Sequence, residues 1–389
     1  MISLQPLGMP PEVQLNRLGW DWMLGKDTSP YLTGEVVRVR EREAEAYAKA
    51  AGQLYEMLVS AGQYVLDHNL FDKLGIPANL VKMIRITWED DRNLHLYGRF
   101  DLAGGLDGQP IKLIEFNADT ATCIPETAVV QWAQLLANGL SERSQFNTLY
   151  EALTANFRRL REANPDLAPT LLISSMPDSR EDDTNVTVLG EAAKEAGFDV
   201  AYRYVDEVDF SPDEGIFTEE EDGSFYRYHY WFKLVPWEYI AHDEPQLADT
   251  LTEITVRRKA IILNPAYTLL FQSKAIMKVL WDLYPYHPLL LETIDEPFAH
   301  KKSVEKVLFG REGANVRILD PSGEVLNAED GDYGAYPKIY QEFTPLLRDA
   351  RDYHYQAGVF FAWEPCGLGY RRGGPIIGNT SQFVGHIVD

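Results

Sequence analysis

The sequence of 389 residues is long enough for two domains, or for one large domain with an insertion. Hydrophobic residues make up 45% and charged residues 24%, which is typical of globular proteins and excludes a disordered chain. The formal net charge of −23 argues against a nucleic-acid or anionic-lipid surface, because both partners require a basic face.

Cysteine content and hydropathy indicate the cellular location of the protein. The chain has only Cys123 and Cys366, too few for a disulfide scaffold or a cysteine-based zinc site. The N-terminus shows no basic segment followed by an apolar core. The sequence also contains no run of about 18 apolar residues, the length needed to span a membrane. We therefore expect a cytoplasmic protein with no membrane partner.

Apolar spacing predicts the elements of the first part of the chain. In chain order these are an irregular segment over 1–34, a helix over 35–69, a hairpin over 93–118 that turns at Asp107–Gly108, and helices over 124–139 and 143–163. The hairpin is the best-defined element, since alternation of apolar and polar residues changes there from a helical period to a period of two.

The middle of the chain is predicted to form a separate unit. An apolar strand, a polar loop, an amphipathic helix and a second strand predict a β-α-β unit with a parallel pair. We place an inserted domain at 166–262, in which the acidic stretch 218–224 should be a solvated turn. A helix with the sequence SKAIMKVLWDLY, a glycine loop FGREG and more strands follow. The chain thus divides into 1–165, 166–262 and 263–389, with a mixed α/β or α+β fold.

The predicted hairpin carries two acidic residues that should face each other. Alternation places Arg99 and Asp101 on one face of the first strand, and Leu113, Glu115 and Asn117 on one face of the second. Asp101 then lies opposite Glu115, where like charges repel. A magnesium ion would relieve this repulsion, because hard cations take oxygen ligands. An exposed acidic face, neutralised by water and Arg99, fits the spacing equally well.

Residues beyond the hairpin could hold anions. Asp119, Thr120 and Thr122 either cap the next helix or bind a substrate at its N-terminus. Lys274, which should open a helix, and Lys306, just before the glycine loop, could pair with phosphates that the loop's N–H groups cover. A plain hairpin with a lysine that reaches solvent explains the same pattern.

Several segments together resemble one family. The segment KIYQEF has Gln341 and Glu342 where an adenine could be hydrogen-bonded, although the pattern alone favours an ordinary strand. The chain resembles the synthetase domain of the glutathionylspermidine synthetases in RFD…IEFNADTAT, SKAIMKVLWDLYP, KVLFGREGANV, IYQEF and GLGYRRGG, over about residues 15–389. The resemblance implies an ATP-grasp fold with an inserted pre-ATP-grasp-like β-α-β domain. It also implies a carboxylate–amine ligase that uses ATP and Mg²⁺.

The resemblance also implies roles for individual residues. It implies metal ligation by Asp101, Glu115 and Asn117, and catalysis by Arg99 and Arg371. Nucleotide binding would involve Arg99, Phe100, Asp101, Lys274, Lys306, Arg311, Gly313, Gln341, Glu342 and Ile376. The acid substrate would be contacted by Thr120 and Thr122, and substrate also by Glu181.

The acceptor side departs from the family. In FKLVPWEYI (232–240) an apolar residue stands where the family has a substrate-side threonine, and we expect no counterpart of the amidase domain of bifunctional members. We therefore expect a ligase that joins a small, peptide-like acid to an amine through an acyl phosphate. The alternatives are an ATPase or phosphotransferase without an amine acceptor, a true glutathionylspermidine synthetase, and a nucleotide-binding protein without chemistry.

Overall fold

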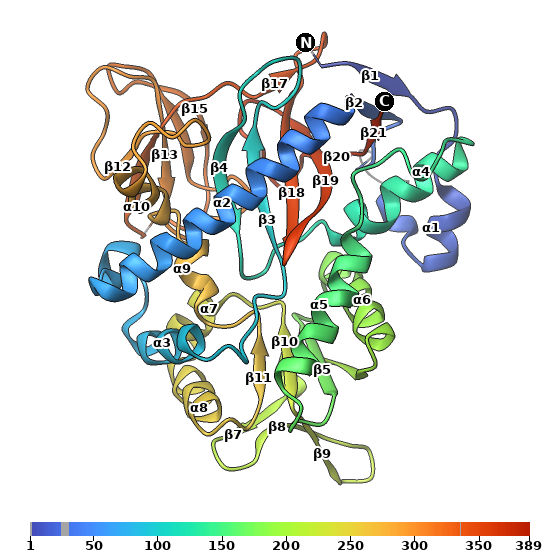
Figure 1. The fold of residues 1–389 in the computed structure, drawn as a ribbon, viewed down its shortest axis with the longest axis vertical. Coiled ribbons are helices and arrows are strands. Elements are labelled where there is room, and N and C mark those ends of the chain that lie inside the picture. Colours follow the sequence, from blue (N-terminus) through green and yellow to red (C-terminus); the bar gives the residue numbers. More distant parts are fainter. Residues whose placement is uncertain (1, 25–30, 335) are drawn as a thin grey trace.

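The computed structural model of the protein describes residues 2–24, 31–334 and 336–389. Its architecture is mixed α/β, and the strands of the described residues form five sheets (Figure 1). Among these residues no helix combines the length and apolar character needed to cross a membrane.

The central antiparallel sheet contains the predicted hairpin. Its order is β20 (Gln382–Val384), β19 (Glu364–Gly373), β18 (His354–Ala362), β3 (Gly98–Ala103) and β4 (Lys112–Asn117), with β17 (Leu347–Arg348) paired to β18. The turn between β3 and β4 is confirmed: Asp107 and Gly108 both have positive φ, as a type I′ turn requires. Helix α2 (Glu41–Asp67) crosses one face of this sheet (Figure 1) and leaves the other face to the site.

A second antiparallel sheet contains the glycine loop. Its order is β12 (Thr293–Ile294), β16 (Lys338–Glu342), β13 (Ser303–Val307), β14 (Val316–Leu319) and β15 (Val325–Glu329). The loop joins β13 to β14. Helices α9 (Thr268–Gln272) and α10 (Ile276–Leu283) precede this sheet. Lys274 lies between these two helices and does not open one, because the extended backbone of Ser273 ends α9.

The middle of the chain forms a parallel sheet, as predicted. Its order is β11 (Ile261–Leu263), β10 (Tyr230–Lys233), β5 (Thr170–Ser175) and β6 (Asp199–Tyr204), with α6 (Arg180–Glu195) between β5 and β6 and helices α7 (Trp237–Asp243) and α8 (Pro245–Val256) between β10 and β11. A small antiparallel sheet of β7 (Asp209–Ser211), β8 (Gly215–Glu219) and β9 (Phe225–Tyr228) is attached. The acidic stretch 218–224 forms the end of β8 and the turn to β9.

The N-terminal prediction needs correction. Residues 1–34 are not all irregular, since they contain β1 (Leu4–Pro6), α1 (Glu12–Leu18) and the 3-10 helix η1 (Asp21–Leu24); residues 1 and 25–30 lie outside the described residues. The helix predicted from residue 35 begins at Glu41. Residues Glu35–Val39 form strand β2 between β1 and β21 (His386–Val388). Their β-branched valines favour a strand once partner strands are available.

The helices predicted over 124–139 and 143–163 are present with shifted ends, the first as the π-helical turn η4 (Glu126–Val130) with α4 (Gln131–Ala137) and the second as α5 (Leu149–Ala163). The structure also contains helices that were not predicted: η2 (Phe71–Leu74), η3 (Ala78–Leu80), α3 (Val81–Glu89) and η5 (Val205–Glu207). Helix α5 begins later than predicted, because the Thr148 N–H bonds the Cys366 carbonyl oxygen of the central sheet at 2.7 Å.

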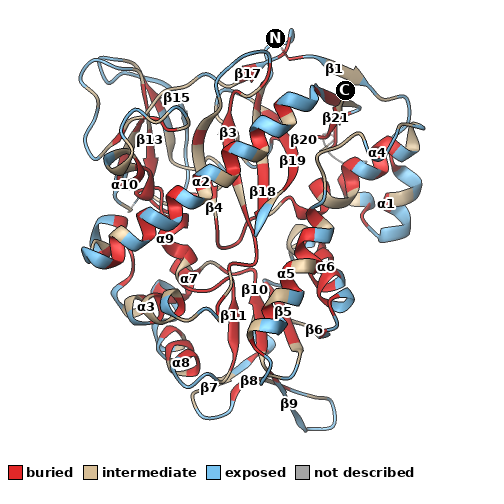
Figure 2. Cartoon of the chain, in the orientation of Figure 1, coloured by how far each residue is buried: buried red, intermediate tan, exposed pale blue. Residues whose placement is uncertain are grey.

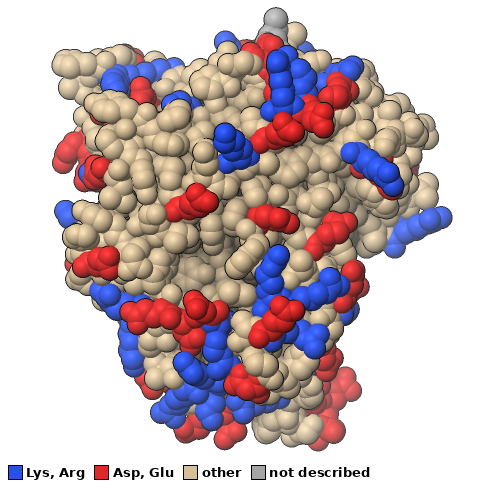
Figure 3. Space-filling model, in the orientation of Figure 1, with Lys and Arg blue, Asp and Glu red and all other residues tan. Residues whose placement is uncertain are grey.

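Two apolar cores support the site. One lies between α2 and the central sheet, and the other surrounds the parallel sheet but also includes Tyr97 and Phe360 from the central region. Figure 2 shows the strands of both sheets as the most continuously buried elements. On the face seen in Figure 3, acidic and basic side chains are interspersed. The division into 1–165, 166–262 and 263–389 remains a proposal.

Candidate active site

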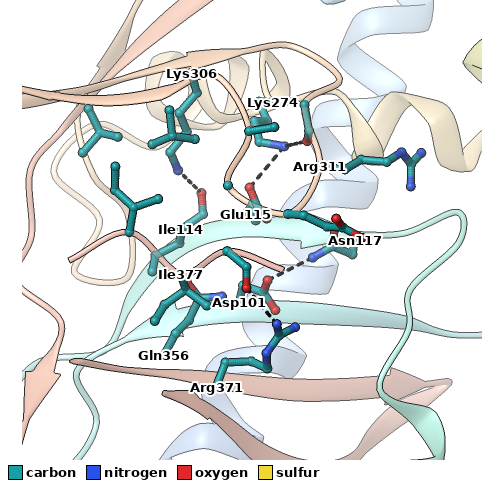
Figure 4. A pocket seen from close by; sticks show the side chains of 18 of the residues that line it. Asp101, Ile114, Glu115, Asn117, Lys274, Lys306, Arg311, Gln356, Arg371 and Ile377 are labelled. Atoms are coloured by element: carbon teal, nitrogen blue, oxygen red, sulfur yellow. Dashed lines mark hydrogen bonds and ion pairs between the residues drawn. The ribbon is translucent and has the colours of Figure 1, made fainter. Parts of the chain in front are cut away.

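A pocket between the central sheet and the β12–β16 sheet collects the residues that the sequence singled out (Figure 4). Its lining includes Arg99, Asp101, Glu115, Asn117, Thr120, Thr122, Glu181, Lys274, Lys306, Arg311, Gly313, Gln341, Glu342, Arg371 and Ile376. Phe100 is the exception. Its side chain points to the other face of β3 and stacks on Phe116 in the core, with ring centroids 4.0 Å apart. We therefore exclude the Phe100 side chain from the proposed nucleotide contacts.

The hairpin places its two acids opposite each other, as predicted. Asp101 is the register partner of Glu115, and Arg99 is the partner of Asn117. Arg99 Nε donates to Asp101 Oδ1 at 2.7 Å, and Asn117 Nδ2 donates to Asp101 Oδ2 at 3.1 Å. The side chains of Asp101 and Glu115 are only 4% and 24% exposed, so this is not the solvated acidic face of the alternative interpretation.

The hairpin register shifts next to the acids. Asp101 pairs with Glu115 but Leu102 pairs with Leu113, so Ile114 is the extra residue of a β-bulge. Leu113 therefore turns into the core and does not share the face of Glu115, contrary to strict alternation. Ile114 lines the pocket instead, and its carbonyl oxygen accepts a hydrogen bond from Lys306 Nζ at 3.1 Å.

Two buried lysines approach the acids from the opposite wall of the pocket (Figure 4). Lys274 Nζ lies 3.2 Å from Glu115 Oε2 and donates to the Gly310 carbonyl oxygen at 2.6 Å. Burial lowers the pKa of Lys306 to about 8, although Glu115 opposes this shift. Burial alone would raise the pKa of Glu115, but Lys274 and Lys306 outweigh it and the pKa is lowered. Arg99, Lys274 and Lys306 face Asp101 and Glu115, so this cluster has three cationic and two acidic side chains.

The hairpin donors fit a magnesium ion. Asp101, Glu115 and Asn117 offer carboxylate and amide oxygens from one face, and magnesium is commonly held by one or two carboxylates together with substrate phosphates. Within the described part of the chain, no group of three His, Cys, Asp or Glu side chains could hold a metal ion. A magnesium ion at this hairpin would therefore take its remaining ligands from substrate and water.

The glycine loop packs tightly over one side of the pocket. Gly313 has a φ of 74°, and a Cβ atom there would lie 2.7 Å from the Ile377 carbonyl oxygen. Both the backbone conformation and the close contact therefore require glycine. The loop is also held by Lys274, through the Gly310 carbonyl oxygen.

The two residues of the predicted adenine segment have different surroundings. Gln341 Oε1 accepts from Lys306 Nζ at 2.9 Å, and its Nε2 donates to the Leu113 carbonyl oxygen at 3.4 Å. The Gln341 side chain therefore positions Lys306 and is not a free hydrogen-bonding edge. Glu342 lines the pocket beside the apolar Leu291 and Phe343.

The predicted substrate side combines cations and a perturbed acid. Thr120 Oγ1 accepts from Arg311 Nη1 at 2.8 Å, and the Thr122 carbonyl oxygen accepts from Arg99. Arg371 Nη2 donates to the Gly378 carbonyl oxygen, while its buried Nε has no hydrogen-bond partner. Burial, together with the nearby Glu126, raises the pKa of Glu181 to about 7. Glu181 is thus poised to change charge near neutrality.

A layer of buried charged side chains next to Thr120 and Arg311 was not predicted from the sequence. Asp119 does not cap the helix that follows it in sequence and does not line the pocket. It is fully buried, accepts a hydrogen bond from the N–H of Trp237 at the start of α7 at 2.9 Å, and bonds Lys233 Nζ at 3.1 Å. Glu238 is also fully buried and bonds Arg311 at 2.6 Å. The pocket-lining Gln356 on β18 was missed too, although the alternation in HYQAGVFF could have placed it beside Arg371, its register partner.

Comparisons with known proteins identify relatives of this chain. Residues 6–389 match the family model of the glutathionylspermidine synthase preATP-grasp. A Haemophilus influenzae protein named "Putative acid–amine ligase" is 30% identical over 388 residues, which cover 96% of this chain and 95% of that protein. The Escherichia coli bifunctional glutathionylspermidine synthetase/amidase is 25% identical over 79% of this chain and 52% of its own length. The trypanothione synthetase of Crithidia fasciculata is 27% identical over 85% of this chain.

The chain spans nearly all of the Haemophilus relative but only about half of the bifunctional synthetase/amidase and of trypanothione synthetase. Among solved structures, a glutathione synthetase-like effector from Globodera pallida aligns over 98% of both chains, with a TM-score of 0.58 and 11% identity. That likeness shows a shared glutathione synthetase-like fold. With the family model matched over almost the whole sequence, the chain belongs to the glutathionylspermidine synthase family.

Proposed function

We propose that this protein is an ATP- and magnesium-dependent carboxylate–amine ligase with an ATP-grasp fold. The observation that carries the proposal is the face-to-face pair of Asp101 and Glu115, with Lys274 and Lys306 on the opposite wall of one pocket. Such a pocket suits a polyphosphate with its metal, because acids bind the metal while lysines bind phosphate oxygens. The matched family and its named ligases support the same reaction class.

The residues on each wall of the pocket have a role in the proposed reaction. Asp101, Glu115 and Asn117 would hold a magnesium ion, which when bound neutralises charge on the phosphates. Lys274 and Lys306 bind the phosphates, and Arg99 stabilises charge on the phosphoryl group as it passes to the substrate carboxylate. The glycine loop excludes water, so that the acyl phosphate is attacked by the amine and not hydrolysed.

The acid and the amine are proposed to meet at the end of the pocket near Arg371. Arg371 suits a carboxylate, because a guanidinium can donate two parallel hydrogen bonds to it. Glu181 suits a cationic amine, which would keep its carboxylate ionised despite a pKa near 7. We propose small-molecule substrates of these two classes, the acid being peptide-like, and a cytoplasmic location.

The experiment that tests this function is a substrate matrix. Phosphate release with ATP and Mg²⁺ is measured for combinations of acids and amines, and products are identified by mass. A product that joins one acid to one amine, formed only with ATP, supports the ligase. Phosphate release that no amine alters, with no joined product, would instead identify an ATPase or phosphotransferase.

Lys306 provides a test of nucleotide binding. We expect Lys306→Ala to weaken binding of a Mg²⁺–ATP analogue by about 1.5–3 kcal/mol, the contribution of a hydrogen bond to a charged group. Phosphate favours the protonated lysine, so binding should raise a pKa that is about 8 in the free protein. The protein should therefore take up protons on binding above that pH, and its affinity should fall as the pH rises. Calorimetry in buffers of different ionisation enthalpy measures both quantities.

Lys338→Ala is the matched control for Lys306. Lys338 lies on the neighbouring strand β16, pairs with Glu305 at 2.7 Å and does not line the pocket. Its replacement should change neither the affinity nor the proton uptake. An unchanged affinity in Lys306→Ala as well would show that Lys306 only supports the strand and does not bind phosphate.

We expect little or no glutathionylspermidine from this protein. Leu234 and Val235 fall at the substrate-side position of the family, and both are buried in the core without lining the pocket. They supply no hydroxyl, and a buried polar substrate group left unpaired costs about 1–3 kcal/mol. The measurement is product mass after incubation with glutathione, spermidine, ATP and Mg²⁺. Rapid formation of the conjugate would instead identify a true glutathionylspermidine synthetase.

A further inference from the structure

An ion pair behind the pocket fixes the glycine loop. Arg311 belongs to this loop, and its Nη2 donates to Glu238 Oε1 at 2.6 Å while its Nη1 donates to Thr120 Oγ1 at 2.8 Å. The Glu238 side chain is fully buried in the first turn of α7 and does not line the pocket. One arginine therefore ties the loop both to the exit of the hairpin and to the segment that follows β10.

The partner of Arg311 sits on a rigid support. The Trp237 N–H next to Glu238 donates to Asp119 Oδ2 at 2.9 Å, and the Trp237 indole N–H donates to the Asn264 carbonyl oxygen at 2.9 Å. Asp119 is the neighbour of Thr120 and is itself bonded by the buried Lys233. Both anchors of Arg311, Thr120 and Glu238, thus belong to one hydrogen-bonded unit, so their spacing is fixed.

The pair is poorly suited to a purely stabilising role. Glu238 Oε2 and Arg311 Nε are both buried without a hydrogen-bond partner. Burial of two charges with unused hydrogen-bonding capacity contributes little net stability compared with apolar packing. What such a pair does provide is a fixed position for its members, here an arginine in the loop that covers the pocket.

We propose that Glu238 is a positioning residue that holds the 310–314 loop over the pocket through Arg311 and aims Arg311 at Thr120. Its effect on catalysis rests on the proposed ligase function, but the anchoring of the loop does not. Without Glu238 the loop opens more often, Mg²⁺–nucleotide binds less tightly, and water reaches the acyl phosphate. Phosphate would then be released without formation of an amide.

Hydrogen exchange of the loop tests the anchor without any substrate. We compare amide exchange of residues 308–316 in the wild type, Glu238→Gln, Glu238→Ala and Arg311→Gln. Loss of a charge-assisted hydrogen bond should speed exchange there by about tenfold or more, and leave exchange in β3 and β18 unchanged. Glu238→Gln keeps the shape of the side chain, and the double variant Glu238→Gln/Arg311→Gln should be no faster than the worse single variant.

Glu305→Gln is the matched control. Glu305 lies on β13 at the start of the same loop region, pairs with Lys338 and is 8% exposed, but it does not contact the loop arginine. Amide exchange over 308–316 in Glu305→Gln should equal that of the wild type. Wild-type exchange in all three anchor variants, each folded by its melting curve, would overturn the proposal. Accelerated exchange in the control to the same extent would do so too, because the effect would then not be specific to Glu238.

Activity measurements separate the anchoring of the loop by Glu238 from the proposed ligase function. Once the substrate matrix gives an acid–amine pair, Glu238→Gln should lower kcat and raise the ratio of phosphate to amide by about tenfold, with a smaller change in KM for ATP. An unchanged ratio would refute the positioning role even if exchange is faster. If no pair yields an amide with the wild-type protein, the proposed function fails, while the exchange experiment still decides whether Glu238 anchors the loop.

Discussion

Asp101→Asn or Glu115→Gln is expected to abolish magnesium-dependent ATP turnover, with a loss of about a thousandfold or more. Each substitution removes one of two carboxylates that face each other across the hairpin. Arg99 and Lys274 are the cations that pair with these acids. Binding of phosphate and magnesium would draw both cations toward the phosphates and leave the carboxylates to the metal. The measurement is steady-state phosphate release as a function of Mg²⁺ concentration.

The two variants should differ in one respect. Asp101→Asn leaves the partly buried Arg99 with less charge compensation, whereas Glu115→Gln leaves Lys274 its bond to the Gly310 carbonyl oxygen. A lower melting temperature is therefore expected for Asp101→Asn, and Glu115→Gln is the cleaner test of metal binding. Asp349→Asn, which removes a buried acid paired with Arg351 outside the pocket, is the control and should retain turnover. Normal turnover in Glu115→Gln would contradict the metal site.

The hairpin could be predicted because its information is local. The alternation of residues placed Arg99 and Asp101 on one face of the first strand and Glu115 and Asn117 on one face of the second, and Asp107–Gly108 located the turn. With this turn alone, Leu102 pairs with Leu113 and Asp101 would pair with Ile114, and the bulge moves the partner of Asp101 to Glu115. The bulge at Ile114 could not be predicted in this way. The carbonyl oxygen of Ile114 bonds Lys306, which is far along the chain, so the local pattern carries no signal of this contact.

The buried layer behind the pocket was missed for the same physical reason. Lys233 and Glu238 lie in an apolar stretch, and a charged residue there is ordinarily read as one that reaches solvent. Their partners, Asp119 and Arg311, are distant in sequence. Lys233 on β10 meets Asp119 just beyond the end of β4, and Glu238 on α7 meets Arg311 in the loop between β13 and β14, so only the tertiary packing brings them together. Likewise, residues 35–39 carried a helical apolar period, but pairing with β1 and β21 made them a strand.

Lys233→Met is expected to destabilise the protein by about 3–5 kcal/mol, because it leaves the fully buried Asp119 without its cation. The double variant Lys233→Met/Asp119→Asn should recover much of this loss. It contains no unpaired buried charge, and the amide oxygen introduced at position 119 can still accept the hydrogen bond that Trp237 N–H gives to Asp119. Urea denaturation followed by circular dichroism measures the change as a shift of the midpoint. Lys82→Met, which breaks the exposed pair with Glu253, should cost less than about 1 kcal/mol.

The stability of Lys233→Met should also depend on pH with a defined sign. Burial already raises the pKa of Asp119 in the native protein, even with Lys233 beside it, and removal of that cation should raise it further. A carboxyl whose pKa is higher in the folded state than in the unfolded state binds more protons when folded, so acid favours folding and rising pH opposes it. The variant should therefore be least stable above the folded-state pKa of Asp119 and should regain stability on acidification. The double variant, which has no carboxyl at position 119, should lack this dependence. An equal loss of stability at all pH values in both variants would show that Lys233 acts through its packing against Trp237, over whose ring it lies at 4.2 Å, and not through its charge.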